Sequence, residues 1–168
     1  MLVIKETTSN LQMFQAMMLA NLLSAQQIIL EMKSTKRWDA ITELASLLVQ
    51  HGKIEKKDKQ NVLEALRQRE ETMSTGIGYG IAIPHASSEC ISSVVAGFGR
   101  SSKGISFDAL DNAPVYFIVL FIVPSSQFQI HLRTLAAIAK FLNDKTVRDG
   151  LAKAKDVQQI LGVFTSRM

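Results

Sequence analysis

Residues 74–85 read STGIGYGIAIPH, and this stretch decides what the 168-residue chain is expected to build. Glycines stand at positions 76, 78 and 80, and glycine accepts the positive φ and close backbone approach of tight turns. The apolar run Gly80–Ile83 is short enough for a small buried strand. Pro84 has no backbone N–H and keeps Ile83 extended. The sequence therefore predicts that His85 is aimed from a rigid strand end.

The chain before this stretch has two strong helical patterns. A short helix is expected near residues 17–23, followed by a strand at 28–32. Ser34 and Thr35 are predicted to cap a helix with apolar residues at helical spacing, which ends at His51-Gly52. A second helix is expected over residues 57–70. Residues 1–15 show no pattern and are interpreted as a mobile N-terminal extension to one domain over residues 16–168.

The chain after His85 reads first as strands and then as helices. Strands are expected at 93–99 and 115–123, with a short piece at 105–107 and turns marked by Gly104 and Asp111-Asn112. Ser125 or Ser126 is expected to cap the next helix, and two shorter helices follow near 147–154 and 157–164. The stripe predicted to be buried on the first of these three helices comprises Leu132, Leu135, Ile138, Ala139 and Leu142. This order of elements predicts an α/β fold, a small mixed sheet covered by helices.

Composition narrows the class of protein. Apolar residues make up 47% of the chain and charged residues 20%, as in ordinary globular proteins. The net charge is +4, but acids interrupt the lysines at 53–59 and aromatics are not interleaved with them, so no nucleic-acid partner is expected. The apolar run at 13–23 is short and poorly flanked for a signal peptide, and no run reaches the ~20 residues of a membrane span. Cys90 is the single cysteine, and a cytoplasmic protein without membrane insertion is predicted.

The histidines suggest chemistry of their own. A neutral imidazole is a nucleophile near pH 7, and phosphoryl transfer to it also needs positive charge or N–H donors around the phosphoryl oxygens. By local pattern alone, His85 is equally a nucleophile or a loop histidine. His51, His85, His131 and Cys90 lack the tight spacing of a metal site, and neither a Gly-x-Ser-x-Gly elbow nor a nucleotide P-loop is present, so no metal or cofactor is predicted.

Several separated motifs resemble one family in the same order. They are the LRQRE segment at 66–70, the IAIPH segment at 81–85, GISF at 104–107, DNAPV at 111–115, and Val123-Pro124 with residues 127–142 around His131. These resemble enzyme IIA of the bacterial phosphotransferase system, in the fructose/mannitol superfamily, over residues 20–165. The segments DNAPV and Asp144-Lys145-Thr146 look closest to the nitrogen-regulatory branch. The resemblance implies an α/β sandwich with a mixed sheet.

The resemblance also implies roles for individual residues. His85 matches the phosphorylated nucleophile. His131, which helical register alone would make a core histidine, matches a second active-site histidine that hydrogen bonds to the phosphoryl group. Arg69 matches an active-site arginine whose planar guanidinium suits phosphoryl oxygens, with Arg67 as the alternative. Thr75 and Gly76 are predicted to offer a hydroxyl and amides to phosphate, or else to form a plain tight turn.

The implied activity is a phosphohistidine relay, which makes the chain a phosphotransferase component. Phosphoryl would arrive on His85 from a histidine phosphocarrier protein, HPr or its nitrogen-branch counterpart. In the regulatory branch the phosphorylation state alters binding to regulated partner proteins. In the sugar branch the phosphoryl group passes to a cysteine of a IIB domain during fructose- or mannitol-type uptake. A third reading is a binding module without turnover, which would not need Arg69, His85 and His131 together.

Overall fold

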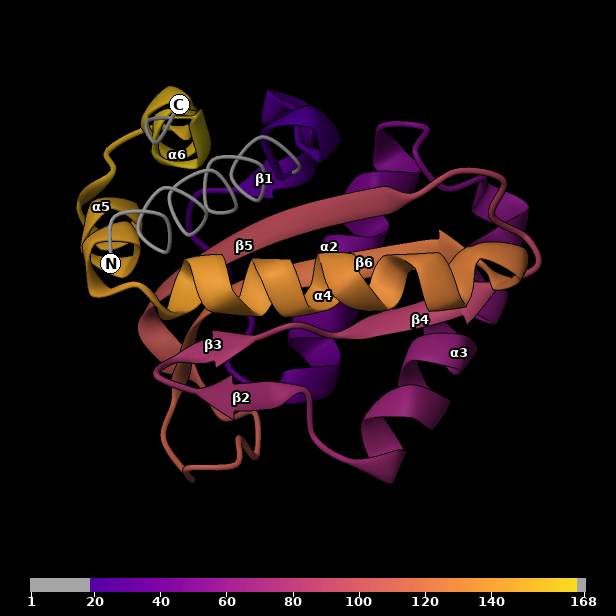
Figure 1. The fold of residues 1–168 in the computed structure, drawn as a ribbon, viewed down its shortest axis with the longest axis horizontal. Helices are drawn as coiled ribbons and strands as arrows, with labels where there is room; N and C mark the ends of the chain where they lie inside the picture. The colour runs from indigo at the N-terminus through magenta and orange to yellow at the C-terminus, as the bar shows by residue number, and fades with distance from the viewer. Residues whose placement is uncertain (1–18, 166–168) are drawn as a thin grey trace, which may run out of the picture.

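A six-stranded mixed β-sheet forms the middle of three layers in the computed structural model, which describes residues 19–165 (Figure 1). The strands lie in the order β1-β5-β6-β3-β2, and β4 also pairs with β6. The bounds are β1 Ile28–Ile29, β2 Gly76–Gly78, β3 Ile81–Ala82, β4 His85–Ser88, β5 Val95–Ile105 and β6 Val115–Pro124. The sheet is mixed because β6 pairs antiparallel with β5 and parallel with both β3 and β4.

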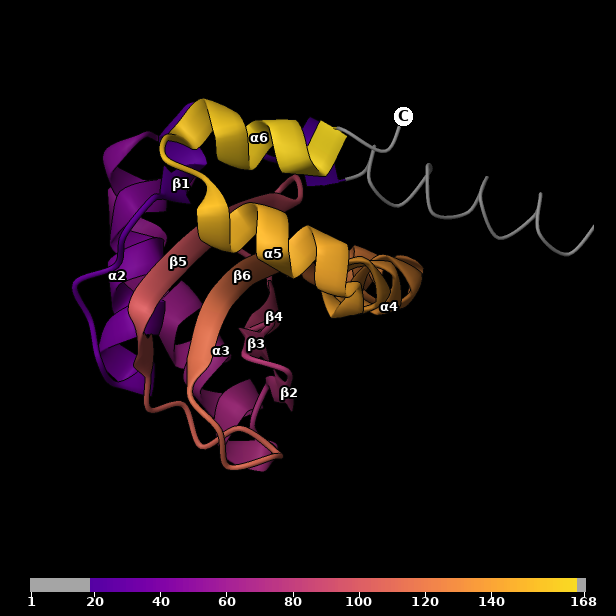
Figure 2. The same ribbon diagram turned by 90° about the vertical axis from the view of Figure 1, so that its left-hand side faces the viewer.

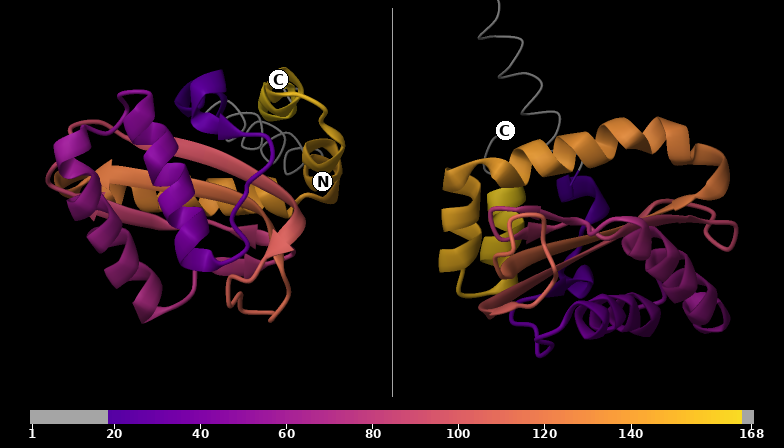
Figure 3. Two further views of the ribbon diagram at one scale, coloured as in Figure 1. Left: turned by 180° about the vertical axis from the view of Figure 1, so that it is seen from behind. Right: turned by 90° about the horizontal axis from the view of Figure 1, so that it is seen from below.

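Helices cover both faces of this sheet, as Figures 2 and 3 show. The helices α4, α5 and α6 lie on one face, and α2 and α3 lie on the other. Their bounds are α2 Arg37–Gln50, α3 Lys59–Thr72, α4 Phe128–Asn143, α5 Lys145–Lys153 and α6 Val157–Thr165. Three short 3-10 turns precede β1, α3 and α4, at Ala25–Gln27, Lys56–Asp58 and Ser125–Gln127. The predicted α/β class, with a small mixed sheet covered by helices, is confirmed.

Strand β6 explains why both faces of the sheet are covered by hydrophobic layers. Its nearly uninterrupted apolar sequence places alternate side chains on opposite faces of the sheet. Phe117, Val119 and Phe121 pack toward α4 and its neighbours, whereas Ile118 and Leu120 pack toward α2 and α3. The nine-residue run predicted at 115–123 is therefore a central strand buried on both faces.

The strand predicted at Gly80–Ile83 is β3 in the structure, and a separate strand, β4, follows after Pro84. β3 pairs with Phe117 and Ile118, and β4 continues further along β6, beginning with His85 opposite Phe121. Pro84 separates them because it lacks an N–H, although its carbonyl still accepts from the Phe121 amide at 3.0 Å. His85 therefore begins a second strand, β4, that the sequence reading missed.

The hairpin before β3 depends on close backbone approach. β2 was also missed, because glycines at alternate positions give little strand signal. A Cβ added to Gly76 would lie 2.7 Å from Cβ and 2.8 Å from Cα of Ala109, so only glycine fits there. Gly80 has a φ of +75°, and its carbonyl accepts from the amides of Tyr116 and Phe117. These glycines bring β2 and β3 against the loop between β5 and β6.

Helix ends were predicted less well than helix positions. Helix α2 has Lys36 as its N-cap, whereas the amide and hydroxyl of Ser34 donate to Glu43. The N-cap of α4 is Gln127, because Ser125 and Ser126 lie in the preceding 3-10 turn. The end of α2 at His51 and Gly52 is confirmed, and Gly52 has a φ of +68°.

Three further expectations differ in detail. The strand expected over 28–32 shortens to β1, although the amide of Met32 still donates to the Arg100 carbonyl. The helix expected at 57–70 runs two residues later, as α3. Leu132, which was expected in the buried stripe of α4, is 43% exposed, because it lies at the edge of that stripe. Ile138 and Leu142 of the same stripe are buried. The proposed extension over residues 1–15 lies outside the described residues and stays a prediction.

Candidate active site

His85 lies at the start of β4 on the face of the sheet that α4 covers. Its side chain is half-buried, and its Cα pairs with that of Phe121 in the centre of the sheet. Leu135 and Ala139 of α4 line the same pocket as the imidazole. The short strands on either side of Pro84 therefore fix the backbone of His85 against the rigid strand β6.

The two ring nitrogens of His85 have different partners. Nδ1 lies 2.7 Å from the carbonyl oxygen of Ile83, and a carbonyl only accepts, so Nδ1 carries the proton. Nε2 lies 3.2 Å from Nε of Arg69, and a guanidinium only donates, so Nε2 presents its lone pair. Both contacts select the same neutral tautomer, in which Nε2 is the nucleophilic atom.

The surroundings of His85 also favour the neutral imidazole. Burial lowers the pKa of His85 below its ordinary value of 6.5. The bond to the Ile83 carbonyl and the charge of Glu70 raise this pKa, whereas the positive charge of Arg69 lowers it. The net shift is downward, so the imidazole favours the form in which Nε2 is unprotonated at neutral pH.

Arg69 reaches His85 from the last turn of α3. Besides its Nε contact with His85, its Nη1 donates to the carbonyl of Met73 at 2.9 Å. In residues 19–165, no hydrogen bond uses Arg69 Nη2. The alternative arginine, Arg67, instead places its guanidinium carbon 4.8 Å from the ring centre of Trp38. The geometry therefore puts Arg69, and not Arg67, beside the histidine.

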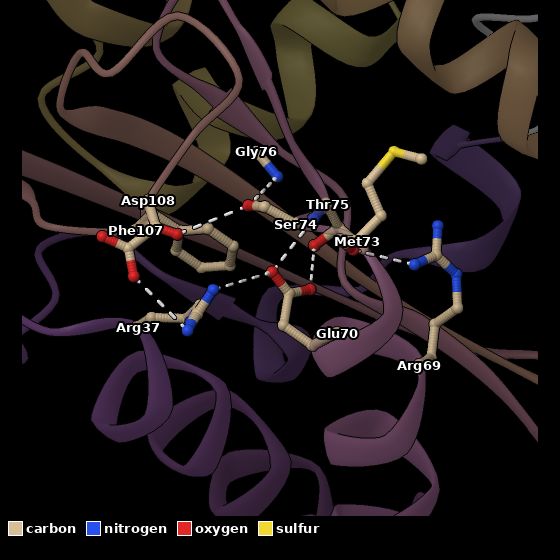
Figure 4. A network of polar contacts seen from close by, with 9 residues as sticks. All are labelled: Arg37, Arg69, Glu70, Met73, Ser74, Thr75, Gly76, Phe107 and Asp108. Carbon is tan, nitrogen blue, oxygen red and sulfur yellow. Dashed lines mark hydrogen bonds and ion pairs between the residues drawn. The ribbon is translucent and has the colours of Figure 1, made fainter.

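The hydroxyl and amide donors predicted to bind phosphate already form hydrogen bonds within the protein. The amide and the hydroxyl of Thr75 both donate to the Glu70 carboxylate, and the amide of Gly76 donates to Oγ of Ser74 at 3.1 Å (Figure 4). Thr75 lines the pocket at His85, but its donors would meet a phosphoryl group only if the bonds to Glu70 opened. A phosphate-binding role for Thr75 and Gly76 stays a prediction.

His131 lies in the second turn of α4, one turn before Leu135. Its ring makes an edge contact with Phe121, the residue paired with His85, with ring centres 6.0 Å apart. Its Nε2 lies 3.3 Å from Gln127 Oε1, and its buried Nδ1 has no hydrogen-bond partner. In the described part of the chain no hydrogen bond joins His131 to His85 or Arg69. The structure brings Arg69 and His85 into contact, whereas His131 contacts Phe121, the residue paired with His85.

An open pocket of about 200 Å³ adjoins the His85 imidazole. Arg69, Thr75 and Ile83 contribute to its wall, together with Leu135 and Ala139 of α4. Three large apolar side chains at its rim are exposed, namely Met73, Ile77 and Leu110. The reacting nitrogen therefore lies in a small pocket with an apolar edge that another protein can cover.

Sequence reasoning missed the importance of Glu70. This carboxylate is 2% exposed, and its partners Thr75 and Arg37 come from separate segments. Its spacing gave a signal, since Val62, Leu66 and Glu70 lie four residues apart on the buried face of α3. A carboxylate on an apolar stripe needs partners, so the pattern could have identified it.

Two other properties concern the described residues. Between Leu19 and Thr165, the structure shows no group of three or more His, Cys, Asp or Glu side chains arranged to hold a metal ion. In the same range no helix is long and apolar enough to cross a membrane.

A neutral histidine beside a guanidinium, on a strand paired with the central strand of a helix-covered mixed sheet, is the arrangement that a histidine phosphoryl carrier needs. The sequence profile of the family described as "Phosphoenolpyruvate-dependent sugar phosphotransferase system, EIIA 2" matches residues 21–166. The chain belongs to this family of phosphotransferase components, as the sequence motifs predicted.

Similar proteins fall into a regulatory and a sugar-specific group. The chain is 41% identical over 107 residues to a nitrogen regulatory protein from Escherichia coli, covering 63% of this chain and 66% of that protein. It is 35% identical over 137 residues to the fructose-specific EIIA component of Haloferax volcanii, covering 82% and 88%. The crystal structure of nitrogen regulatory protein IIA-Ntr from Neisseria meningitidis superposes with a TM-score of 0.79 at 27% identity, covering 88% of this chain and 99% of that one.

Proposed function

We propose that this chain accepts a phosphoryl group on Nε2 of His85 from a histidine phosphocarrier protein, HPr or its nitrogen-branch counterpart, and acts in the cytoplasm as a regulatory IIA protein. The observation that carries this proposal is the pair of contacts on the imidazole. The Ile83 carbonyl accepts a hydrogen bond from Nδ1–H, and Nε of Arg69 donates to Nε2, the nitrogen that must attack.

The transfer itself needs few protein groups. The lone pair of Nε2 forms the new N–P bond, while the N–P bond to the phosphocarrier breaks and its electron pair returns to the carrier's ring nitrogen. The imidazole of His85 becomes more positive as this bond forms, and the Ile83 carbonyl stabilises that charge through Nδ1–H. Arg69 gives up its hydrogen bond to Nε2 as the lone pair attacks, and its planar N–H donors turn to the arriving phosphoryl oxygens.

His131 is proposed as a second phosphoryl contact, from α4. Its ring makes an edge contact with Phe121, the residue paired with His85, and Leu135, one turn further along α4, lines the pocket at His85, so the imidazole lies near the place that a phosphoryl group would occupy. That position suits a residue that helps the phosphoryl group to leave toward the next acceptor. His85 on the sheet and Arg69 on α3 would serve acceptance of the phosphoryl group, and His131 on α4 would serve its donation.

The regulatory role is supported by similarity to proteins named for nitrogen regulation, including the E. coli and N. meningitidis proteins. The runner-up is a sugar-specific IIA component that passes phosphoryl to a IIB cysteine. The similarity to the fructose-specific component of H. volcanii favours that second function.

The site assignment is tested by replacing His85. We expect His85→Ala to fold normally and to take up no phosphoryl group when incubated with phosphoenolpyruvate and a reconstituted phosphocarrier system. His51→Ala is the matched control, because His51 lies at the end of α2, and it should be labelled like the unmodified chain. Mass spectrometry at neutral or basic pH locates the acid-labile phosphohistidine. A phosphohistidine on His131 or His51 in His85→Ala would refute the assignment.

A further inference from the structure

Glu70 is a buried carboxylate for which the transfer chemistry provides no direct use. It is 2% exposed, and burying a carboxylate costs several kcal/mol unless charges and hydrogen bonds compensate it. The compensation comes from Thr75, whose amide donates to Oε1 at 2.9 Å and whose hydroxyl donates to Oε2, and from Arg37, whose Nη1 lies 3.8 Å away. Figure 4 shows these partners converging on Glu70 from different segments.

A continuous series of hydrogen bonds leads from Glu70 to the reacting imidazole. Glu70 binds the amide of Thr75, and the carbonyl of Thr75 accepts from the amide of Ile83 at 3.0 Å. The carbonyl of Ile83 then accepts from Nδ1–H of His85 at 2.7 Å. Thr75 and Ile83 are the residues on either side of the β2–β3 hairpin. Glu70 therefore holds one side of the base of this hairpin, and Ile83, on the other side of the same base, orients His85.

The neighbouring residues Arg69 and Glu70 contact different parts of this site. Adjacent residues on a helix point about 100° apart, and Figure 4 shows the Arg69 side chain directed toward Met73 while Glu70 points to Thr75. Arg69 thus meets Nε2 of His85 directly, and Glu70 acts on Nδ1 through the backbone of Thr75 and Ile83. Each member of the pair controls a different ring nitrogen.

We propose that Glu70 is a positioning residue for phosphoryl transfer, which fixes the Ile83 carbonyl and thereby holds His85 in the tautomer with the proton on Nδ1. This inference rests on the proposed function of His85. Without the anchor at Thr75, the backbone at Ile83 is free to shift and the imidazole can carry its proton on Nε2 instead. In that tautomer Nε2 has no lone pair with which to attack.

Arg37 supplies the counter-charge, and it offers a control. Its Nη2 lies 3.4 Å from Asp108 Oδ2, so Arg37 joins Glu70 and Asp108, but the Asp108 side chain is 75% exposed and lies outside the series that reaches His85. Asp108→Asn therefore removes one carboxylate bound to Arg37 and keeps the bonds from Glu70 to Thr75.

The experiment measures the tautomer and the transfer rate together. The full chain is labelled with ¹⁵N histidine, and the ring nitrogen chemical shifts of His85 are recorded for the unmodified protein, Glu70→Ala, Glu70→Gln and Asp108→Asn. We expect Nδ1–H in the unmodified protein and in Asp108→Asn, and a mixture of tautomers in Glu70→Ala. Single-turnover acceptance from the phosphocarrier should fall about 10- to 100-fold in Glu70→Ala. Glu70→Gln should be intermediate, because its amide oxygen still accepts from the Thr75 amide.

The outcomes separate positioning from a purely structural role. A folded Glu70→Ala protein that is less stable but retains the Nδ1–H tautomer and the full transfer rate would overturn the proposal. If Glu70→Ala does not fold, Glu70→Leu carries the test, because leucine fills the space of the carboxylate and accepts neither bond from Thr75. An unchanged tautomer and transfer rate in Glu70→Leu would equally overturn the proposal. If the unmodified protein takes no phosphoryl group on His85, the proposed function fails, while the tautomer comparison still decides whether Glu70 positions the ring.

Discussion

At the scale of single residues, the site depends on the geometry of the Arg69 guanidinium as well as on its charge. Arg69 uses Nε toward His85 and Nη1 toward the Met73 carbonyl, so one rigid guanidinium spans two groups. Lysine has a single ammonium nitrogen and cannot span both. We expect Arg69→Lys to lower the single-turnover rate of phosphoryl acceptance by about 10² to 10³.

The neighbouring arginine provides the control for this prediction. Arg67 stacks on Trp38 and is exposed, so Arg67→Lys should accept phosphoryl at nearly the rate of the unmodified protein. Rapid-quench measurement with a phosphorylated carrier decides between the two positions. A larger loss in Arg67→Lys than in Arg69→Lys would show that the wrong arginine has been assigned.

A second prediction at this scale concerns the pKa of His85. Burial and Arg69 lower it below 6.5, so an NMR titration of the His85 ring should give a midpoint below that value. In Arg69→Gln the guanidinium charge is gone, and the midpoint should move upward, whereas Arg67→Gln should leave it in place. A downward or absent shift in Arg69→Gln would contradict the electrostatic role.

The same shift affects folding stability with a definite sign. Above pH 6.5 the imidazole is neutral in both the folded and the unfolded chain, so it contributes nothing. Below pH 6.5 the unfolded chain takes up the proton first, and stability falls until the folded imidazole also titrates. His85→Asn should flatten this acid dependence in urea unfolding measured between pH 5 and 7.

At the scale of secondary-structure elements, α4 brings a second histidine toward the site by a route separate from the sheet. His131 lies one turn before Leu135, which lines the pocket at His85. We expect His131→Ala to accept phosphoryl at close to the normal rate and to donate it about 10²-fold more slowly, because one donor to the departing group is lost. Single-turnover rates in both directions test this.

Gln127 offers a matched comparison on the same helix. Gln127→Ala removes the partner of His131 Nε2 and keeps the imidazole. Donation by Gln127→Ala should therefore lie between that of His131→Ala and that of the unmodified protein. Equal rates for all three proteins, in both directions, would leave His131 with only its packing against Phe121.

The elements also show what the sequence could and could not predict. Helical spacing located α2, α3, α4, α5 and α6, and the apolar run located β6, because these segments carry their signal over nine or more residues. Strands β2, β3 and β4 have two to four residues and are defined by pairing with β6 or with each other. Their bounds depend on tertiary contacts, which local pattern does not contain.

In the candidate site, too, some features follow from sequence pattern and others depend on tertiary contacts. The family motif predicted roles for His85, Arg69 and His131, since residue type and order carry that resemblance. The tautomer of His85 depends on a backbone carbonyl two residues away, and the role of Glu70 depends on bonds to Thr75. Those contacts arise only when the β2–β3 hairpin folds against α3, so helical spacing could mark Glu70 as a buried carboxylate but could not name its partners.

At the scale of the whole molecule, the reacting histidine opens onto a surface that combines apolar and positive groups. Met73, Ile77 and Leu110 are exposed at the pocket, and Arg69 lies within it. A phosphoryl group on His85 adds about −1.5 to −2 charges at neutral pH. The rim then surrounds a negative centre in the phosphorylated protein, where the free protein has a neutral ring beside a cation.

A partner that covers this rim should bind one phosphorylation state better than the other. We expect a difference of about 1–3 kcal/mol, which corresponds to roughly 5- to 150-fold in affinity. Affinity capture with the unphosphorylated and the His85-phosphorylated protein should retain different partners, and titration calorimetry on those partners should give the two dissociation constants. His85→Ala, treated with the same phosphocarrier system, must behave as the unphosphorylated protein throughout. Efficient transfer to the cysteine of a sugar IIB protein, together with equal binding of every partner to both states, would instead assign this chain to sugar uptake.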